Sequence, residues 1–112
     1  MDQANLQGTL VEGLYIKPKS LVVSSTVLAG PTLISADTVH FRHAYFQGRA
    51  ADGTPNVGAV NIGILSAVGQ QPLPVASNKE FQLSAPGNLK YSFSDFYFIV
   101  ASDGDSLVIW YN

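Results

Sequence analysis

The fold of this chain is decided by the stretch Phe96-Tyr97-Phe98-Ile99-Val100-Ala101-Ser102-Asp103-Gly104-Asp105-Ser106-Leu107-Val108-Ile109-Trp110-Tyr111. Its two flanks, Phe96–Ala101 and Leu107–Tyr111, are rich in aromatic and β-branched residues, which are the types enriched in strands. Between them stands an Asp-Gly pair, which is a strong local signal for a hairpin turn. The stretch therefore predicts two strands joined by a tight hairpin.

Similar runs, each bounded by turn residues, extend back toward the N-terminus. They are Leu14–Ile16, Leu21–Leu28, Val39–Gly48, Val57–Ile64, Leu73–Val75, Phe81–Leu83 and Leu89–Phe93. The intervals between them are too short for crossover helices, which favours antiparallel pairing. We therefore predict an all-β fold, an antiparallel β-sandwich or jelly-roll-like barrel of about eight short strands.

Two of these runs carry explicit face assignments, because successive side chains of a strand point to opposite faces. In Val39–Gly48, the alternation predicts one face made of Phe41, His43 and Tyr45 and another made of His40, Arg42 and Phe46. In Val57–Ile64, the predicted inner face consists of Gly58, Val60, Ile62 and Ile64.

The predicted domain organisation is one β-sandwich domain, residues 14–112, preceded by an N-terminal arm, residues 1–13. The arm shows neither sustained alternation nor a helical stripe, although Leu6, Leu10 and Leu14 recur every four residues. Its Gly8 and Gly13 weaken a helix there. We expect the arm to order against another surface.

The composition combines 46% hydrophobic residues with only 12% charged residues and a formal net charge of −2. The charged fraction is about half of that of an average soluble domain, which favours a surface covered by partners. The six Lys and Arg are scattered singly, so nucleic acid is not an expected partner. No apolar run is long enough for a bilayer, and the acidic, amide-rich start does not resemble a signal peptide.

No catalytic or metal site is predicted, and no cofactor is expected. His40 and His43 are the only histidines, and their odd separation sends them to opposite faces of a regular strand. Asp103 and Asp105 offer two carboxylates to a calcium ion but lack acidic neighbours, so a hairpin turn explains them more simply. With no Cys and no Gly-x-Ser-x-Gly elbow, enzymatic activity is not expected.

The aromatic residues near the C-terminus are the strongest remaining feature. Alternation along a strand sends some of these rings outward, where they would stack on sugar rings or become buried at a subunit interface. The predicted partner-interface residues are Leu6, Leu10, Leu14, Tyr97, Trp110 and Tyr111.

The C-terminal half, residues 56–112, resembles small β-sandwich virion proteins of tailed bacteriophages. The resemblance is carried by Asn56–Gly63, Pro72–Val75, Phe81–Leu83, Asp95–Val100 and Asp105–Tyr111. It implies a capsid decoration (cement) protein that binds the major capsid protein on the outer surface of the head. It further implies a homo-oligomer, with a trimer favoured, a location in the virion and no active site.

Three other functions remain open at this point. The first is a head-completion, tail or fibre-base component of the virion. The second is a carbohydrate-binding module, in which Tyr97, Trp110 or Tyr111 forms a stacking platform. The third is a cupin-like enzyme that uses His40 and His43, which the divergence of the two side chains disfavours.

Overall fold

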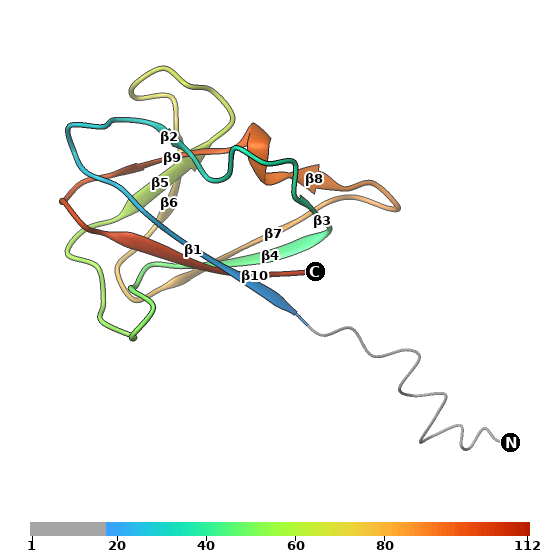
Figure 1. Cartoon of the computed structure of the whole chain (residues 1–112), viewed down its shortest axis with the longest axis horizontal. Coiled ribbons are helices and arrows are strands. Elements are labelled where there is room, and N and C mark those ends of the chain that lie inside the picture. The colour runs from blue at the N-terminus through green and yellow to red at the C-terminus, as the bar shows by residue number, and fades with distance from the viewer. Residues whose placement is uncertain (1–17) are drawn as a thin grey trace, which may run out of the picture.

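The computed structural model describes residues 18–112, and the predicted arm and the run Leu14–Ile16 lie outside them. The described chain is all-β, as predicted, and its two antiparallel four-stranded sheets form a β-sandwich (Figure 1). In chain order the elements are β1 (Lys19–Ser24), β2 (Thr32–Leu33), β3 (His40–Phe41), β4 (His43–Gln47), β5 (Val60–Gly63), β6 (Leu73–Val75), β7 (Glu80–Ser84), β8 (Tyr91–Ser92), the 3-10 turn η2 (Phe93–Asp95), β9 (Tyr97–Val100) and β10 (Ser106–Tyr111).

Sheet A has the strand order β1-β10-β4-β7, and sheet B has the order β2-β9-β5-β6. The short strands β3 and β8 form a separate two-stranded ladder at one end of the sandwich (Figure 1). Within residues 18–112 no helix is long and apolar enough to cross a membrane.

The predicted hairpin between the two C-terminal strands is wrong. Strand β9 pairs with β2 and β5 in sheet B, whereas β10 pairs with β1 and β4 in sheet A. The turn Ser102–Asp105 therefore carries the chain from one sheet to the other. A hairpin within one sheet and a turn that crosses between two sheets have the same local sequence pattern of strand, tight turn and strand. The two connections differ only in which distant strands the flanking strands pair with.

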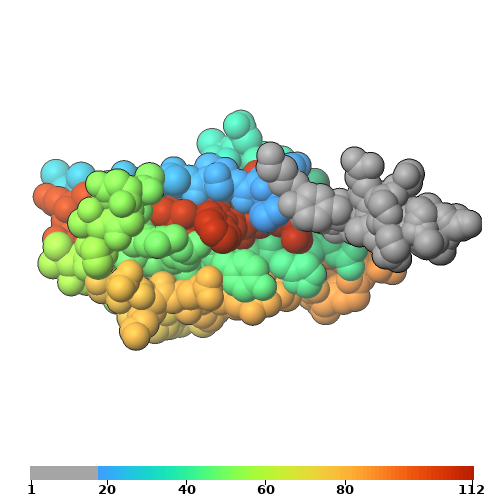
Figure 2. All heavy atoms as spheres, turned by 90° about the horizontal axis from the view of Figure 1, so that it is seen from below, coloured from blue at the N-terminus to red at the C-terminus, as the bar shows by residue number. Residues whose placement is uncertain are grey.

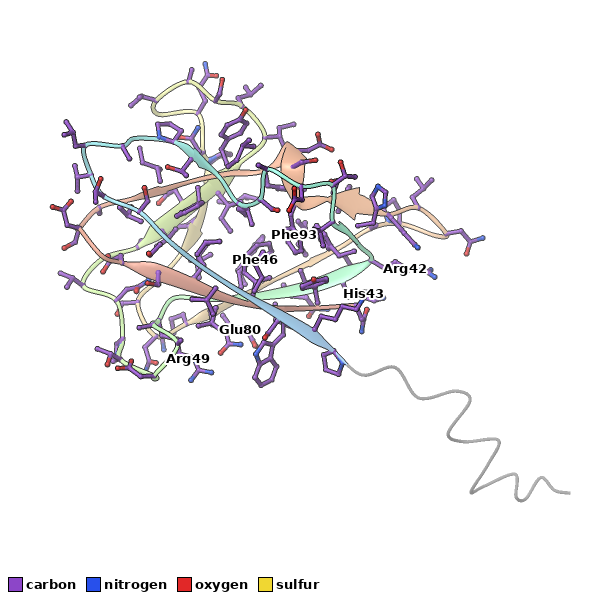
Figure 3. The ribbon with its side chains drawn as sticks, in the orientation of Figure 1. Arg42, His43, Phe46, Arg49, Glu80 and Phe93 are labelled. Carbon is purple, nitrogen blue, oxygen red and sulfur yellow. The ribbon has the colours of Figure 1, made fainter. Side chains whose placement is uncertain are left out.

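The core lies between the two sheets and is built largely from aromatic rings. Phe93 stacks on Phe41 with ring centroids 4.1 Å apart, and it meets Phe46 edge-on at 6.3 Å. All three rings are at most 1% exposed. Figure 3 shows Phe46, from sheet A, and Phe93 pointing into this interior. The inner face of sheet B adds Val60, Ile62 and Phe98 to the same core.

Besides the run Leu89–Phe93, of which only Tyr91–Ser92 is a strand and Phe93 lies in η2, three runs differ in detail from their predicted extents. The run Leu21–Leu28 ends as a strand at Ser24, and Val27 and Leu28 lie exposed in a turn that is closed by two backbone hydrogen bonds. The run Val57–Ile64 narrows to β5, which ends at Gly63, so the predicted inward position of Ile64 is wrong. Its side chain is 66% exposed because the chain folds back there: a Cβ at Gly63 would lie 2.7 Å from the Gln70 carbonyl oxygen.

The third difference is a break at Arg42, which separates β3 from β4. On the far side of the break, Ala44 and Phe46 point inward while His43 and Tyr45 are exposed. Phe41 is also buried, so the predicted common face for Phe41, His43 and Tyr45 is wrong, as is the predicted common face for Phe46 and Arg42. The break resets the phase of the alternation, which a period of two cannot anticipate.

Candidate functional site

The outer face of sheet A presents side chains from four paired strands. Strand pairing sets its side chains in rows across all four strands, and we call this surface the A face. One row is Ser20, Trp110, Tyr45 and Gln82, and the next is Val22, Val108, Gln47 and Glu80. Figure 2 looks onto this face, with β1, β10, β4 and β7 following one another from top to bottom.

Exposed aromatic and apolar side chains mark the centre of the A face. Trp110 is 48% exposed and lies directly opposite Tyr45, which is 38% exposed. Val22, in the adjacent row, is also 48% exposed. Glu80 is the sole charged member of the two rows. This combination of rings with almost no charge is typical of the core of protein–protein interfaces.

At one end of the A face lies a small apolar hollow of about 100 Å³. Its lining comprises Pro18, His43, Tyr45, Trp110, Tyr111 and Asn112. The His43 Nδ1 atom lies 2.9 Å from the Ser84 hydroxyl oxygen, which fixes the ring at the rim. Sites for small-molecule ligands usually measure about 300–1,000 Å³, so this hollow suits a single inserted side chain better than a whole ligand.

At the other end, a polar hollow of about 230 Å³ borders the same face. It is lined by Gln47, Arg49, Asn78, Lys79 and Glu80, so charged groups of both signs gather there. Figure 3 shows Arg49 and Glu80 at this end and His43 and Arg42 at the opposite end. The A face thus has exposed aromatic rings at its centre and charged groups at one end, and protein interfaces likewise combine an apolar core with a polar rim.

A second surface feature lies beside β9 of sheet B, and it includes the segment that precedes β9, from β8 through η2, and the residue that follows β5. It is a hollow of about 530 Å³ lined by Ile64, Tyr91, Ser94, Asp95, Phe96 and Tyr97. The Tyr91 and Phe96 rings meet edge-on at 5.7 Å. The hollow is open to solvent along the exposed Ile64 and Asp95, and it belongs to the opposite sheet from the A face.

The structure separates the residues that the sequence grouped as a partner interface. Trp110 lies on the A face, whereas Tyr97 lines the hollow on sheet B. Tyr111 turns inward, with its ring edge-on to Phe93 at 5.1 Å, and only part of it reaches the apolar hollow. Leu6, Leu10 and Leu14 lie outside the described residues.

Sequence reasoning missed Tyr45 and Val22, which complete the exposed centre of the A face. Tyr45 stands between the buried residues Ala44 and Phe46, so the local alternation does carry the signal for its outward direction. What the sequence lacks is the register that sets Tyr45 opposite Trp110, sixty-five positions later in the chain.

The two aspartates of the turn Ser102–Asp105 form hydrogen bonds to two other loops. Both carboxylate oxygens of Asp105 accept hydrogen bonds from the backbone, from the Val57 N–H and the Gly58 N–H, each at 2.9 Å. Asp103 Oδ1 accepts the Val27 N–H at 2.7 Å. These carboxylates thus face backbone donors. Among residues 18–112, no three His, Asp or Glu side chains gather to hold a metal ion.

The two histidines end up on different ladders, His40 in β3 opposite Ser92 and His43 in β4 opposite Ser84. Both are exposed, so the break at Arg42 does not bring them into the core. The cupin-like alternative requires a cluster of metal-ligating side chains, and residues 18–112 contain no such cluster.

Comparison with known proteins adds no relative to this picture: no family model, no curated protein and no solved structure matches the chain.

Proposed function

We propose that this chain is a non-enzymatic structural protein of a tailed-phage virion. In this proposal it is a decoration (cement) protein that binds the outer surface of the head and stabilises the capsid lattice. The observation that carries the proposal is the exposed pair Trp110 and Tyr45, set opposite each other on the two inner strands of sheet A, on a face whose two neighbouring rows of side chains hold a single charge, Glu80, at the edge strand β7. The sequence resemblance of residues 56–112 supplies the identity of the partner.

The A face has the chemistry that such a role requires. Protein interfaces concentrate their binding energy in a few Trp, Tyr and Arg side chains near the centre, surrounded by contacts that exclude water. Trp110 and Tyr45 occupy the centre, and Arg49 and Glu80 occupy the rim. A low charge on the face lowers the cost of desolvation when it is covered by capsid protein.

The test is binding of the full chain to purified phage heads that lack it. Replacing both rings, Trp110→Ser with Tyr45→Ser, should weaken binding by about 100-fold to 1,000-fold, because truncating one hot-spot residue costs about 2 kcal/mol or more and the costs of neighbouring residues are not fully additive. Tyr97→Ser is the matched control, since it removes a tyrosine from the opposite sheet. Thermal unfolding of each variant, measured in parallel, shows whether the fold is retained.

Three results would contradict the proposal. One is undiminished binding by the doubly substituted A-face variant. Another is loss of binding by Tyr97→Ser alone, which would move the interface to sheet B. A third is a copy number of a dozen or fewer per particle in quantitative mass spectrometry of virions, which would indicate a head-completion, tail or fibre-base component in place of a decoration protein.

A carbohydrate-binding module is the second candidate, and the same pair of rings favours it. Adjacent exposed Trp and Tyr side chains on a flat sheet can stack on sugar rings, whose C–H groups pack on aromatic faces. Trp110 is the only tryptophan, so its fluorescence reports directly on a ligand at the A face. A glycan array without hits and unchanged Trp110 emission on adding oligosaccharides would eliminate this candidate.

A further inference from the structure

Strand β1 forms one edge of sheet A and pairs, within residues 18–112, with β10 alone. Figure 2 shows it along the upper margin of the A face. An edge strand presents a row of backbone N–H and C=O groups to any strand of matching length, so native proteins usually protect such edges with proline, charge or short strands.

Strands β2 and β6 have such protection, whereas β1 and β7 each carry a charge only at their first residue, Lys19 and Glu80. Strand β2 is two residues long, β6 contains Pro74, and β7 begins with Glu80 next to Lys79. After Lys19, β1 continues with five residues, Ser20–Ser24, that contain neither proline nor charge, whereas the corresponding run in β7 has four residues, Phe81–Ser84.

The inward side of β1 is incompletely covered. Leu21 and Val23 point toward the core and pack against it, yet both are only partly buried. Their neighbours on β10, Leu107 and Ile109, are fully buried, because β10 has a strand on each side. A further strand along β1 would extend the same protection to Leu21 and Val23.

The sequence of β1 matches itself when reversed. In an antiparallel pairing of two copies centred on Val22, Ser20 lies opposite Ser24, Leu21 lies opposite Val23, and Val22 faces Val22. Moving the centre to Leu21 would instead set the charged Lys19 opposite Val23. The register centred on Val22 places serine opposite serine and apolar residues opposite apolar residues on both faces of the sheet.

We infer that two copies of this chain pair through the β1 edge, antiparallel and centred on Val22, to form a dimer with a continuous eight-stranded sheet. This interface is isologous, since the same patch serves both copies. It joins the two A faces into one surface. The inference does not depend on the proposed virion role, and it predicts a dimer where the family resemblance implies a trimer.

Disulfide trapping tests this register directly, because the chain has no cysteine of its own. In the proposed register the two Val22 Cα atoms lie about 4.5–5.5 Å apart, within the range that a disulfide spans. The full chain with Val22→Cys should therefore form a covalent dimer under mild oxidation. Ser20→Cys is the matched control, because its two copies would stand about 13 Å apart along the strands.

A mixture of Ser20→Cys and Ser24→Cys chains should cross-link to each other while neither cross-links alone. Equal cross-linking of Val22→Cys and Ser20→Cys would mean random collision and would overturn the inference. So would a monomer or trimer of the unmodified chain in sedimentation equilibrium.

A second measurement needs no cysteine. Val22 is half exposed, so a charge there is compatible with the fold of one copy. Val22→Lys should raise the dissociation constant of the dimer at least tenfold, because two like charges would face each other across the new ladder. Mixing Val22→Lys with Val22→Glu should restore the dimer. A dimer unaffected by Val22→Lys would overturn the inference.

Discussion

At the scale of one residue, the Asp105 side chain holds together two segments of the chain that are not paired as strands. It is only 4% exposed, and its two oxygens hold the Val57 and Gly58 amides of a distant loop. Asn56 works beside it in the same way: its side-chain amide donates to the Ser106 carbonyl oxygen at 2.7 Å and accepts the Ser106 N–H at 2.9 Å. Together these two side chains fix the connection from β4 to β5 against the start of β10.

We therefore expect Asp105→Asn to lower the free energy of unfolding by about 1–3 kcal/mol, since the buried side chain then offers an N–H group to a backbone N–H whose hydrogen bond Asp105 accepts. Urea denaturation measures the change. Asp103→Asn is the control, because Asp103 is exposed and its one hydrogen bond needs only one oxygen. Equal losses from both substitutions would show that burial of Asp105 is unimportant.

At the scale of elements, the connection Ile64–Pro72 joins the paired strands β5 and β6, and its end returns close to Gly63. Gln71 holds it there: its side-chain amide donates to the Leu65 and Ala67 carbonyl oxygens at 2.7 and 2.9 Å. Asn61 in β5 adds a bond of 3.0 Å to the Gln71 carbonyl oxygen. Close approach of this connection to β5 requires a residue without a Cβ at position 63.

Gly63→Ala should accordingly destabilise the fold by about 1–3 kcal/mol, the usual cost of forcing extra volume into a packed site. Its Cβ would meet backbone atoms of Gln70 and Gln71, which cannot move aside as a flexible side chain can. Ile64→Ala, at the next position, removes an exposed side chain and should change the urea midpoint little. A neutral Gly63→Ala would mean that the connection relocates freely.

At the scale of the whole molecule, the two sheets share one aromatic core. Phe46 from β4 meets Phe93 from η2, and Phe93 stacks on Phe41 from β3. The same buried cluster includes Ile109 from sheet A and Ile62 and Phe98 from sheet B, so separating the sheets would expose it. We predict that residues 14–112 form a single domain, which implies that they unfold cooperatively. The shared core is the physical reason to expect this of residues 18–112.

We expect the chain to unfold in one transition, as most domains under 150 residues do. Far-UV circular dichroism follows the strands, and the fluorescence of the single Trp110 follows sheet A alone. The two urea curves should share one midpoint. Separate midpoints would contradict a common core and would indicate that the sheets unfold independently.

The sequence by itself determined the fold class and most strand positions, because β-branched and aromatic runs between turn residues are local signals. It also led us to predict that some aromatic rings near the C-terminus point outward, without saying which, and its scarcity of charge led us to predict a surface covered by partners. Only the tertiary structure decided that the turn Ser102–Asp105 crosses between sheets and that Tyr45 stands opposite Trp110. It also decided that Tyr97 and Tyr111 leave that face. The reason is physical: local preference sets which residues extend, whereas the choice of partner strand and register depends on burying the aromatic core that distant segments share.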